Sequence, residues 1–304
     1  MKLSVIIPCK NEEGNVEKLY KEFKDTLENI KYELIFIDDG STDNTLKVLK
    51  EIYNNDKKCI KILSFSRNFK KEAAMLAGLH HSTGKYTCIV DGDLQQKPSY
   101  LLEMVDFLDN NNEYDEVAMV VKNRNNENKI MSLCKKCFYK LIDKLCDIHF
   151  EENASDFRMF RENVKDAIIS LNEVNRFSKG IFSFVGFNVK YLTYEVEKRN
   201  SGKSSFGFIN SVKYALSGII DFSTKPLKLS LLFGIIAITI SLVYLLLNIT
   251  NLEIENMIIV LLLLFSGLQF IFISIIGAYI SNIQSEVKNR PTYIIKEKIG
   301  FKED

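Results

Sequence analysis

Short apolar runs alternate with segments of helical periodicity through roughly the first 120 residues of the chain. The runs have the length of buried strands, and the segments between them carry apolar residues at helical spacing. This alternation is typical of an α/β fold with an open, mostly parallel sheet. The predicted strands are Leu3–Ile7, Glu33–Ile37, Ile60–Phe65, Tyr86–Val90 and Glu116–Val121. The predicted helices are Val16–Asn29, Thr45–Tyr53, Glu72–His81 and Tyr100–Leu108.

The chain begins directly with a strand. Met1 and Lys2 lead into the first apolar run, which we expect to end at Pro8 because proline cannot donate a ladder hydrogen bond. This start does not resemble a cleavable signal peptide, so the bulk of the chain is expected in the cytosol.

Polar clusters follow the first four predicted strands. In an open parallel sheet, ligands bind beyond the carboxyl ends of the strands. Because these clusters meet at one edge of the sheet, they predict a single binding site. The clusters are Cys9–Glu12, Asp38–Ser41, Ser66–Asn68 and Asp91–Asp93.

Asp91 and Asp93 are the most informative pair in these clusters. They follow an apolar strand and are separated by one residue, so in an extended chain both carboxylates face the same way. Two such carboxylates can bind one hard divalent cation and leave coordination positions for substrate phosphates. The alternative for an isolated pair is a solvated turn or a helix cap.

The pattern loosens from Lys129 to about Phe222. It predicts an amphipathic helix over Lys129–Cys146, a polar loop, a helix over Asn163–Leu171 and then a Phe- and Tyr-rich stretch. Within it, Phe206–Ile220 has apolar residues at helical spacing, which suits a helix lying along a bilayer surface.

Two motif-like stretches in this region do not predict sites. Cys134–Cys137 and Cys146–His149 have zinc-like spacing, but they lie on one predicted helix at roughly 18 Å from each other, too far to share a metal. Ser201–Ser204 resembles the end of a phosphate-binding loop, but Glu197 stands where that motif requires glycine.

Two long apolar runs dominate the C-terminal part. Leu227–Leu247 contains one charge at its edge and Met257–Ile280 contains none, so each is long enough to span a bilayer. Lysine and arginine flank the pair, whereas the intervening loop has neither, which predicts a hairpin with both ends in the cytoplasm. The expected organisation is a cytoplasmic domain over 1–222, a transmembrane hairpin over 223–282 and a cytoplasmic tail over 283–304.

Composition agrees with a catalytic domain joined to a membrane anchor. The chain has 304 residues, of which 46% are hydrophobic and 26% charged, enough to bury a full core. Its net charge of +1, from 40 basic and 39 acidic residues, argues against a protein that binds nucleic acid through bulk charge. The six scattered cysteines lie mostly in apolar contexts, so reduced thiols are expected.

The motifs together resemble glycosyltransferase family 2, in particular its polyprenyl-phosphate branch, which includes dolichol-phosphate mannose synthases and bactoprenol glucosyltransferases. The resemblance runs nearly end to end, and the motifs that carry it stand in the family's order and spacing. They are Val5–Pro8, Asn11–Glu13, Ile37–Thr45, Ser66–Ala74, Asp91–Gln95, Asp156–Arg158 and, less closely, Arg199–Phe206.

The resemblance implies a GT-A (Rossmann-like) α/β domain that binds a nucleotide sugar, with UDP as the favoured nucleotide. It implies Mg²⁺ or Mn²⁺ as cofactor, ligated by Asp91, Asp93 and Gln95. Three positions depart from the family pattern, namely Lys10, Gly92 and Ser205. The implied nucleotide-sugar residues are Pro8, Glu12, Ile37, Asp39, Asp91, Gly92 and Arg124.

The same resemblance implies a polyprenyl (undecaprenyl) phosphate acceptor at the cytoplasmic face of the inner membrane. A lipid monophosphate is already an oxyanion near neutral pH, so direct attack needs no strong general base and inverts the anomeric configuration. Asp93 and Asp156 are the candidate catalytic residues, and Asp156 either orients the acceptor or sugar or caps a helix. The candidates for the acceptor phosphate are Arg158, Arg176, Lys179, Arg199 and Ser204.

Two other functions are compatible with parts of the pattern. One is a membrane enzyme that builds a polysaccharide or glycolipid directly; processive synthases typically carry a Gln-x-x-Arg-Trp motif, and this chain has no tryptophan. The other is a non-enzymatic membrane scaffold, which has no reason to retain both metal carboxylates. The sequence leaves the sugar, the pathway and a homo-oligomeric state open.

Overall fold

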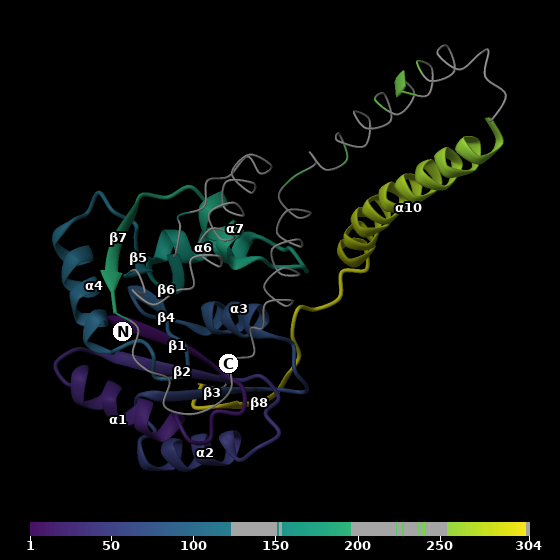
Figure 1. The fold of residues 1–304 in the computed structure, drawn as a ribbon. Helices are drawn as coiled ribbons and strands as arrows, with labels where there is room; N and C mark the ends of the chain where they lie inside the picture. The colour runs from purple at the N-terminus through teal and green to yellow at the C-terminus, as the bar shows by residue number, and fades with distance from the viewer. Residues whose placement is uncertain are drawn as a thin grey trace.

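The computed structural model describes residues 1–122, 151, 154–195, 223, 227, 236, 239–240, 243 and 254–301. Its strands are β1 (Leu3–Cys9), β2 (Tyr32–Asp38), β3 (Ile60–Phe65), β4 (Tyr86–Ile89), β5 (Glu116–Val121), β6 (Ala154–Arg161), β7 (Val189–Tyr194) and β8 (Ile295–Ile299). Its helices are α1 (Val16–Thr26), α2 (Thr45–Asn55), α3 (Lys71–His81), α4 (Ser99–Asn110), α6 (Glu162–Ser170), α7 (Ser178–Phe184) and α10 (Ile254–Val287). The described strands form one sheet in the order β7-β5-β6-β4-β1-β2-β3-β8 (Figure 1).

Helices cover both faces of this sheet, and alternate residues of β1 point into two separate cores. Val5 and Ile7 belong to the core that includes α1, α2 and α4, whereas Ile6 belongs to the core that includes α3, α6 and α7. Successive side chains of a strand point to opposite faces, so a strand covered on both sides is apolar throughout. The α/β fold predicted from the sequence is therefore confirmed, with helices on both faces of the sheet.

The first strand continues through Pro8, so the prediction that it ends there is wrong. The carbonyl of Cys9 accepts a hydrogen bond from the amide of Asp39 in the β2 direction, at 2.9 Å, whereas the carbonyl of Ile6 accepts from Val90 on the β4 side, also at 2.9 Å. Residues two apart in a strand direct their backbone N–H and C=O groups to the same side, so the backbone nitrogen of Pro8 faces β4, as that of Ile6 does. Pairing with β4 ends at Ile6. The missing N–H of Pro8 therefore falls where no ladder partner is needed.

The sheet is more mixed than the predicted parallel pattern. Four of the described strand pairs are parallel and three are antiparallel. The region assigned to a polar loop contains β6, which lies between β4 and β5 and is antiparallel to both. The segment 283–304, which the sequence analysis expects as a cytoplasmic tail, contains β8, and this strand pairs with β3.

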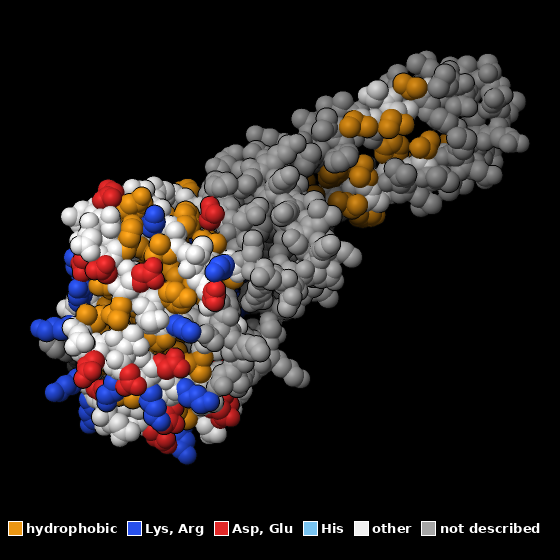
Figure 2. Space-filling model, turned by 60° about the vertical axis from the view of Figure 1, so that its left-hand side comes forward, with side chains coloured by type: hydrophobic (Ala, Val, Ile, Leu, Met, Phe, Trp, Pro, Cys, Tyr) orange, Lys and Arg blue, Asp and Glu red, His pale blue; other side chains and the backbone are white. Residues whose placement is uncertain are grey.

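The helix α10 extends away from the sheet (Figure 1). Its segment Phe265–Val287 is long and apolar enough to cross a membrane, with a mean hydropathy of 1.5. Large apolar side chains are exposed along it, such as Phe270, which is 71% exposed, and Val287, which is 78% exposed. Hydrophobic side chains are visible at the surface of this extension (Figure 2). Such exposure is costly in water and suits a lipid environment. The helix predicted over Met257–Ile280 is confirmed.

Other predicted elements lie outside the described residues. They include the amphipathic helices over 129–146 and 206–220. The first apolar run, 227–247, is described at only five positions. The two-helix hairpin therefore stays a prediction.

Candidate active site

The loops that follow β1 and β2 are joined by reciprocal hydrogen bonds. The amide of Asn11 donates to Ser41 Oγ at 3.0 Å, and the amide of Thr42 donates back to Asn11 Oδ1 at 2.8 Å. The amide of Glu12 donates to Thr45 Oγ1 at 2.8 Å. Asn11 has a φ of 56°, a left-handed conformation that asparagine tolerates better than most residues. The two polar clusters predicted at this sheet edge thus form one surface.

Asp39 holds the third loop, which follows β3, against these two. Its Oδ1 accepts a hydrogen bond from the amide of Phe69 at 2.6 Å and its Oδ2 accepts from the amide of Lys70 at 3.0 Å. Asp39 is buried, and this burial raises the pKa of its carboxyl despite the two amide bonds. At the adjacent Gly40, with φ +59°, a Cβ atom would lie 2.6 Å from the carbonyl carbon of Arg67. Glycine is therefore required where the loops meet.

The remaining residues expected on the donor side lie around these loops. Pro8 pairs with Ile37 in the β1–β2 register. Ile37 has no exposed surface, so it supports the site from below. Glu12 is half-buried, and its Oε2 accepts a hydrogen bond from Asn15 Nδ2 at 2.5 Å. Arg124 lies outside the described residues.

The loop that carries Asp91 and Asp93 packs directly against the end of β1. A Cβ atom at Gly92 would lie 3.1 Å from the carbonyl oxygen of Pro8, so glycine allows this close approach. Gln96 fixes the loop: its Nε2 donates to Asp91 Oδ2 at 3.1 Å, and its Oε1 accepts from the Asp91 amide at 3.0 Å. Asp93 is mostly buried, and its Oδ1 accepts a hydrogen bond from the amide of Gln95 at 3.2 Å.

Lys71, the first residue of α3, connects this loop to Asp156 of β6. Its Nζ lies 2.6 Å from Asp91 Oδ1 and 2.7 Å from Asp156 Oδ2. Burial lowers the pKa of the Lys71 ammonium, but the carboxylates of Asp156 and Asp91 outweigh this effect and raise it above its ordinary value. The sequence analysis assigned no role to Lys71 or Gln96, because neither spacing nor residue type shows which distant residues they contact.

Asp156 lies inside strand β6, which excludes the helix-capping alternative. Burial raises the pKa of its carboxyl, but the charges of Lys71 and then Lys179 outweigh that effect, so the pKa lies below its ordinary value. Asp156 Oδ1 is buried and has no hydrogen-bond partner among the described residues. An acceptor oxygen in this state is ready for a donor from a ligand.

The residues expected to bind a metal fit a hard divalent cation by their chemistry. Asp91, Asp93 and Gln95 offer carboxylate and amide oxygens, the ligands that Mg²⁺ and Mn²⁺ prefer. Asp91 already has a positively charged partner in Lys71, which shows that the loop attracts a cation. Within the described ranges, no group of three or more His, Cys, Asp or Glu side chains is placed to hold a metal. Two carboxylates on one cation leave coordination positions that substrate phosphates can fill.

Two of the cations predicted to bind the acceptor have internal partners. Arg158 is buried, donates to Glu116 Oε1 at 2.6 Å and lies 4.6 Å from the ring centroid of Phe182. Arg176 donates to the carbonyl oxygens of Leu171 at 2.6 Å and Ile168 at 3.1 Å. Both arginines therefore stabilise the fold.

The other three acceptor candidates have different positions. Lys179 lies in α7, close enough to lower the pKa of Asp156. Arg199 and Ser204 lie outside the described residues.

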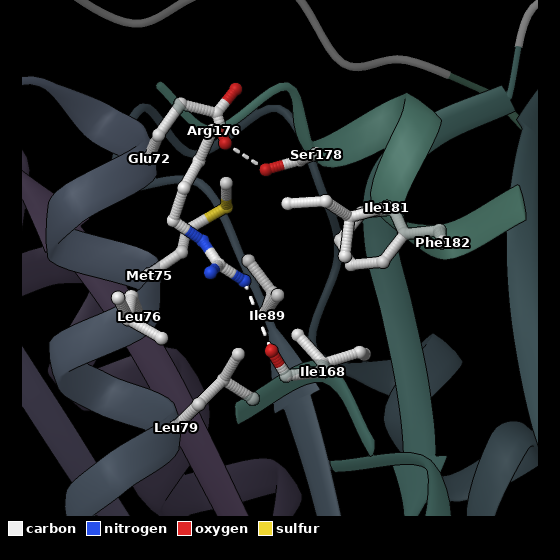
Figure 3. Close-up of a pocket in the computed structure, with 10 residues that line it drawn as sticks. All are labelled: Glu72, Met75, Leu76, Leu79, Ile89, Ile168, Arg176, Ser178, Ile181 and Phe182. Atoms are coloured by element: carbon white, nitrogen blue, oxygen red, sulfur yellow. Dashed lines mark hydrogen bonds between the residues drawn. The ribbon is translucent and has the colours of Figure 1, made fainter. Parts of the chain in front are cut away.

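A small pocket opens between α3, α6 and α7 (Figure 3). It is lined mainly by apolar side chains such as Met75, Leu79 and Phe182. Its polar groups are already engaged, because Ser178 Oγ donates to Glu72 and Arg176 donates to the carbonyl of Ile168. This pocket belongs to the core of the domain. None of its lining residues belongs to the loop edge, by which we mean the surface formed by the loops that follow β1, β2, β3 and β4.

The fold and the polar loops at the carboxyl ends of its strands define a GT-A-like α/β domain, and comparison with known proteins gives its family. The glycosyl transferase family 2 domain matches residues 4–168. CsbB of Bacillus subtilis is 36% identical over 305 residues, covering 97% of this chain and 91% of that protein. A prophage-derived bactoprenol glucosyl transferase of Shigella flexneri is 34% identical over 306 residues, covering 98% of both chains. The chain belongs to glycosyl transferase family 2 and is a glycosyltransferase.

Among solved structures, the fold is similar to glucosyl-3-phosphoglycerate synthase of Mycobacterium tuberculosis in complex with Mn²⁺, UDP-glucose and phosphoglyceric acid. The TM-score is 0.52 at 17% identity, and the match covers 72% of this chain and 77% of that one. At this identity the likeness establishes the GT-A-like fold.

Proposed function

We propose that the enzyme transfers a sugar from a nucleotide diphosphate sugar to a polyprenyl phosphate at the cytoplasmic face of the cell membrane. The observation that carries this proposal is that the loop edge and the apolar helix α10 belong to one folded unit. The strand β8, which follows α10, pairs with β3, and the loop after β3 is the one that Asp39 holds. The likeness to a bactoprenol glucosyl transferase over 98% of both chains supports a lipid-linked acceptor.

On the donor side, the loops after β1, β2 and β3 provide the surface for the nucleotide, and Asp91, Asp93 and Gln95 would hold Mg²⁺ or Mn²⁺ next to its diphosphate. Such a cation neutralises the charge that develops on the leaving diphosphate. We favour a UDP-sugar, since the Mycobacterium tuberculosis synthase with the same fold was crystallised with UDP-glucose and Mn²⁺.

On the acceptor side, an oxygen of the lipid monophosphate attacks the anomeric carbon directly. The new bond joins that carbon to the phosphate oxygen, and the bond to the nucleoside diphosphate breaks with its electrons leaving on the diphosphate. A single in-line displacement inverts the anomeric configuration. Asp156 positions the sugar in this step: its Oδ1, which has no hydrogen-bond partner among the described residues, is an acceptor, and a sugar hydroxyl supplies the donor that a phosphate oxyanion lacks.

Positive side chains near the membrane would hold the acceptor phosphate. Lys179 is the described candidate, because Arg158 and Arg176 are engaged in the fold. Arg199 and Ser204 complete the proposed set from the sequence alone. The predicted juxtamembrane helix over 206–220 would bring the lipid to them along the bilayer surface.

The direct test is to identify the product. Membranes that contain the enzyme are incubated with a panel of labelled sugar nucleotides and undecaprenyl phosphate. We expect one donor to give a lipid-linked monosaccharide that extracts into organic solvent and releases its sugar in mild acid. Membranes with an Asp91→Asn variant serve as the control. A labelled polymer, or a product that forms equally without undecaprenyl phosphate, would contradict the proposed acceptor and favour the polysaccharide alternative.

A further inference from the structure

Two carboxylates hold the Lys71 ammonium group at a place where the helix dipole of α3 is unfavourable for a positive charge. Lys71 is the first residue of α3, where the helix dipole favours negative charge and disfavours an ammonium group. Its side chain nevertheless reaches both Asp91 and Asp156, at 2.6 and 2.7 Å. Asp91 lies in the loop after β4 and Asp156 lies in β6, so the lysine links two parts of the chain that are distant in sequence.

The bond to Lys71 also occupies the part of Asp91 that a metal would use. Asp91 Oδ2 accepts from Gln96 and Asp91 Oδ1 contacts the ammonium of Lys71, so both oxygens have partners in the free enzyme. A divalent cation that binds Oδ1 must displace this ammonium, because two positive charges at one carboxylate oxygen repel each other strongly. The ammonium has a second carboxylate within reach and can move wholly to Asp156.

We propose that Lys71 is a built-in competitor of the divalent cation: it occupies Asp91 in the free enzyme and shifts onto Asp156 when the metal binds. This inference rests on the metal-binding part of the proposed function. It makes Lys71 a positioning residue, which holds the donor loop and Asp156 together until the metal and its sugar nucleotide arrive. The exchange also ties metal occupancy of Asp91 to the pairing of Asp156, the residue that we place against the sugar.

The test measures Mn²⁺ binding to the full chain in detergent without any nucleotide, using the electron paramagnetic resonance signal of free Mn²⁺. Lys71→Met removes the competing charge while keeping a long side chain, so we expect Mn²⁺ to bind about tenfold more tightly than to the native chain. Lys71→Arg keeps the charge and should bind Mn²⁺ within about threefold of the native chain. Unchanged or weaker binding in Lys71→Met overturns the inference.

Two further variants separate this inference from the proposed function. Asp91→Asn should weaken Mn²⁺ binding in the otherwise native chain; if it does not, the metal assignment itself fails. If Asp91→Asn weakens binding but Lys71→Met does not tighten it, only the role of Lys71 is wrong. Thermal unfolding checks that each variant is folded, and Lys71→Gln carries the same expected tightening if Lys71→Met proves unstable.

Discussion

Individual carboxylates at the loop edge have different tasks. Asp39 bonds two backbone amides and shapes a loop, whereas Asp91 and Asp93 sit in the loop that contacts the end of β1. We propose the second kind as the metal ligands, because both oxygens of Asp39 accept backbone amides, whereas Asp93 accepts one such bond through Oδ1. The pair Asp91 and Asp93 was predictable from their spacing after a strand. Lys71 was not, because its importance depends on contacts between residues that are distant in sequence.

Asp93→Asn tests the metal assignment at this scale. The amide is nearly isosteric but lacks the charge that a divalent cation requires, and the cation stabilises the leaving diphosphate by several kcal/mol. We expect transfer to fall by more than ~100-fold while the thermal unfolding temperature stays close to that of the native enzyme. Excess EDTA should abolish native activity, and added Mg²⁺ or Mn²⁺ should restore it. Full activity in excess EDTA would contradict the metal assignment.

Helices and strands with local sequence patterns were predicted well, and those that depend on distant pairing were not. The alternation of apolar runs placed β1 to β5 and α1 to α4 within a few residues of their observed ends. In contrast, β6 carries the charged residues Asp156 and Arg158, so its sequence resembles that of a loop. It is a strand because β4 and β5 pair with its two edges. The strand β8 has isoleucine only at its two ends and Lys-Glu-Lys between them, a pattern that also fits a solvated tail.

The contact between α3 and β1 gives a prediction for the stability of the core. A Cβ atom at Gly78 would overlap the fully buried side chain of Ile6. Gly78→Ala should lower the free energy of unfolding by about 1–3 kcal/mol, measured by thermal or denaturant unfolding in detergent, because this core has no room for a methyl group. Gly267→Ala is the matched control, since a Cβ atom at Gly267 would meet no atom of the described part of the chain within 4 Å. Equal stability of both variants would show that α3 can shift freely.

The opposite end of the sheet contains a buried carboxylate that makes stability depend on pH. Glu33 of β2 lies 2.6 Å from Lys61 Nζ and accepts hydrogen bonds from Ser4 and Thr83. Burial raises the pKa of the Glu33 carboxyl, but the bonds to Lys61, Ser4 and Thr83 outweigh this effect and lower it below its ordinary value of 4.5. The folded state therefore favours the charged form, which stabilises the protein above that ordinary value.

This contribution should disappear as the pH falls through the lowered pKa of the folded state. We expect the native enzyme to be more stable than Glu33→Gln near neutral pH, and the difference in unfolding free energy to shrink in acid below pH 4.5. The exposed Glu28→Gln is the control and should show little difference at any pH. A difference for Glu33→Gln that is constant with pH would contradict the assignment.

In the whole molecule, the segment that contains the apolar helix α10 is inserted between two strands of one sheet. The strand β7 precedes it and β8 follows it, and both belong to the same sheet. The return path is fixed by several contacts: the amide of Ser66 donates to the carbonyl of Ile294 at 3.0 Å, and the ring of Tyr293 stacks on Phe65 at 5.3 Å. The catalytic loops and the end of α10 are therefore joined through β8 as well as through the chain before α10.

This connection restricts the topology of the chain in the membrane. Because both ends of the inserted segment lie in one sheet, the chain between them must cross the bilayer an even number of times. If α10 crosses once, a second crossing must lie between Tyr194 and Ile254, and Leu227–Leu247 is the run with the required length and apolarity. The stretch 248–253, which precedes α10, would then lie on the side of the membrane opposite to the proposed active site.

Cysteine labelling with a membrane-impermeant maleimide on intact cells measures this topology. Asn251→Cys should react, because it lies in the predicted outer loop, whereas Asn289→Cys should react only after the cells are permeabilised, because it lies between α10 and β8. The unmodified chain gives the background from the native cysteines, of which Cys9 and Cys88 are buried. Labelling of Asn289→Cys in intact cells would place the sheet outside the cell. Such a result would separate the active site from cytosolic sugar nucleotides and contradict the proposed function, whatever the state of the metal site.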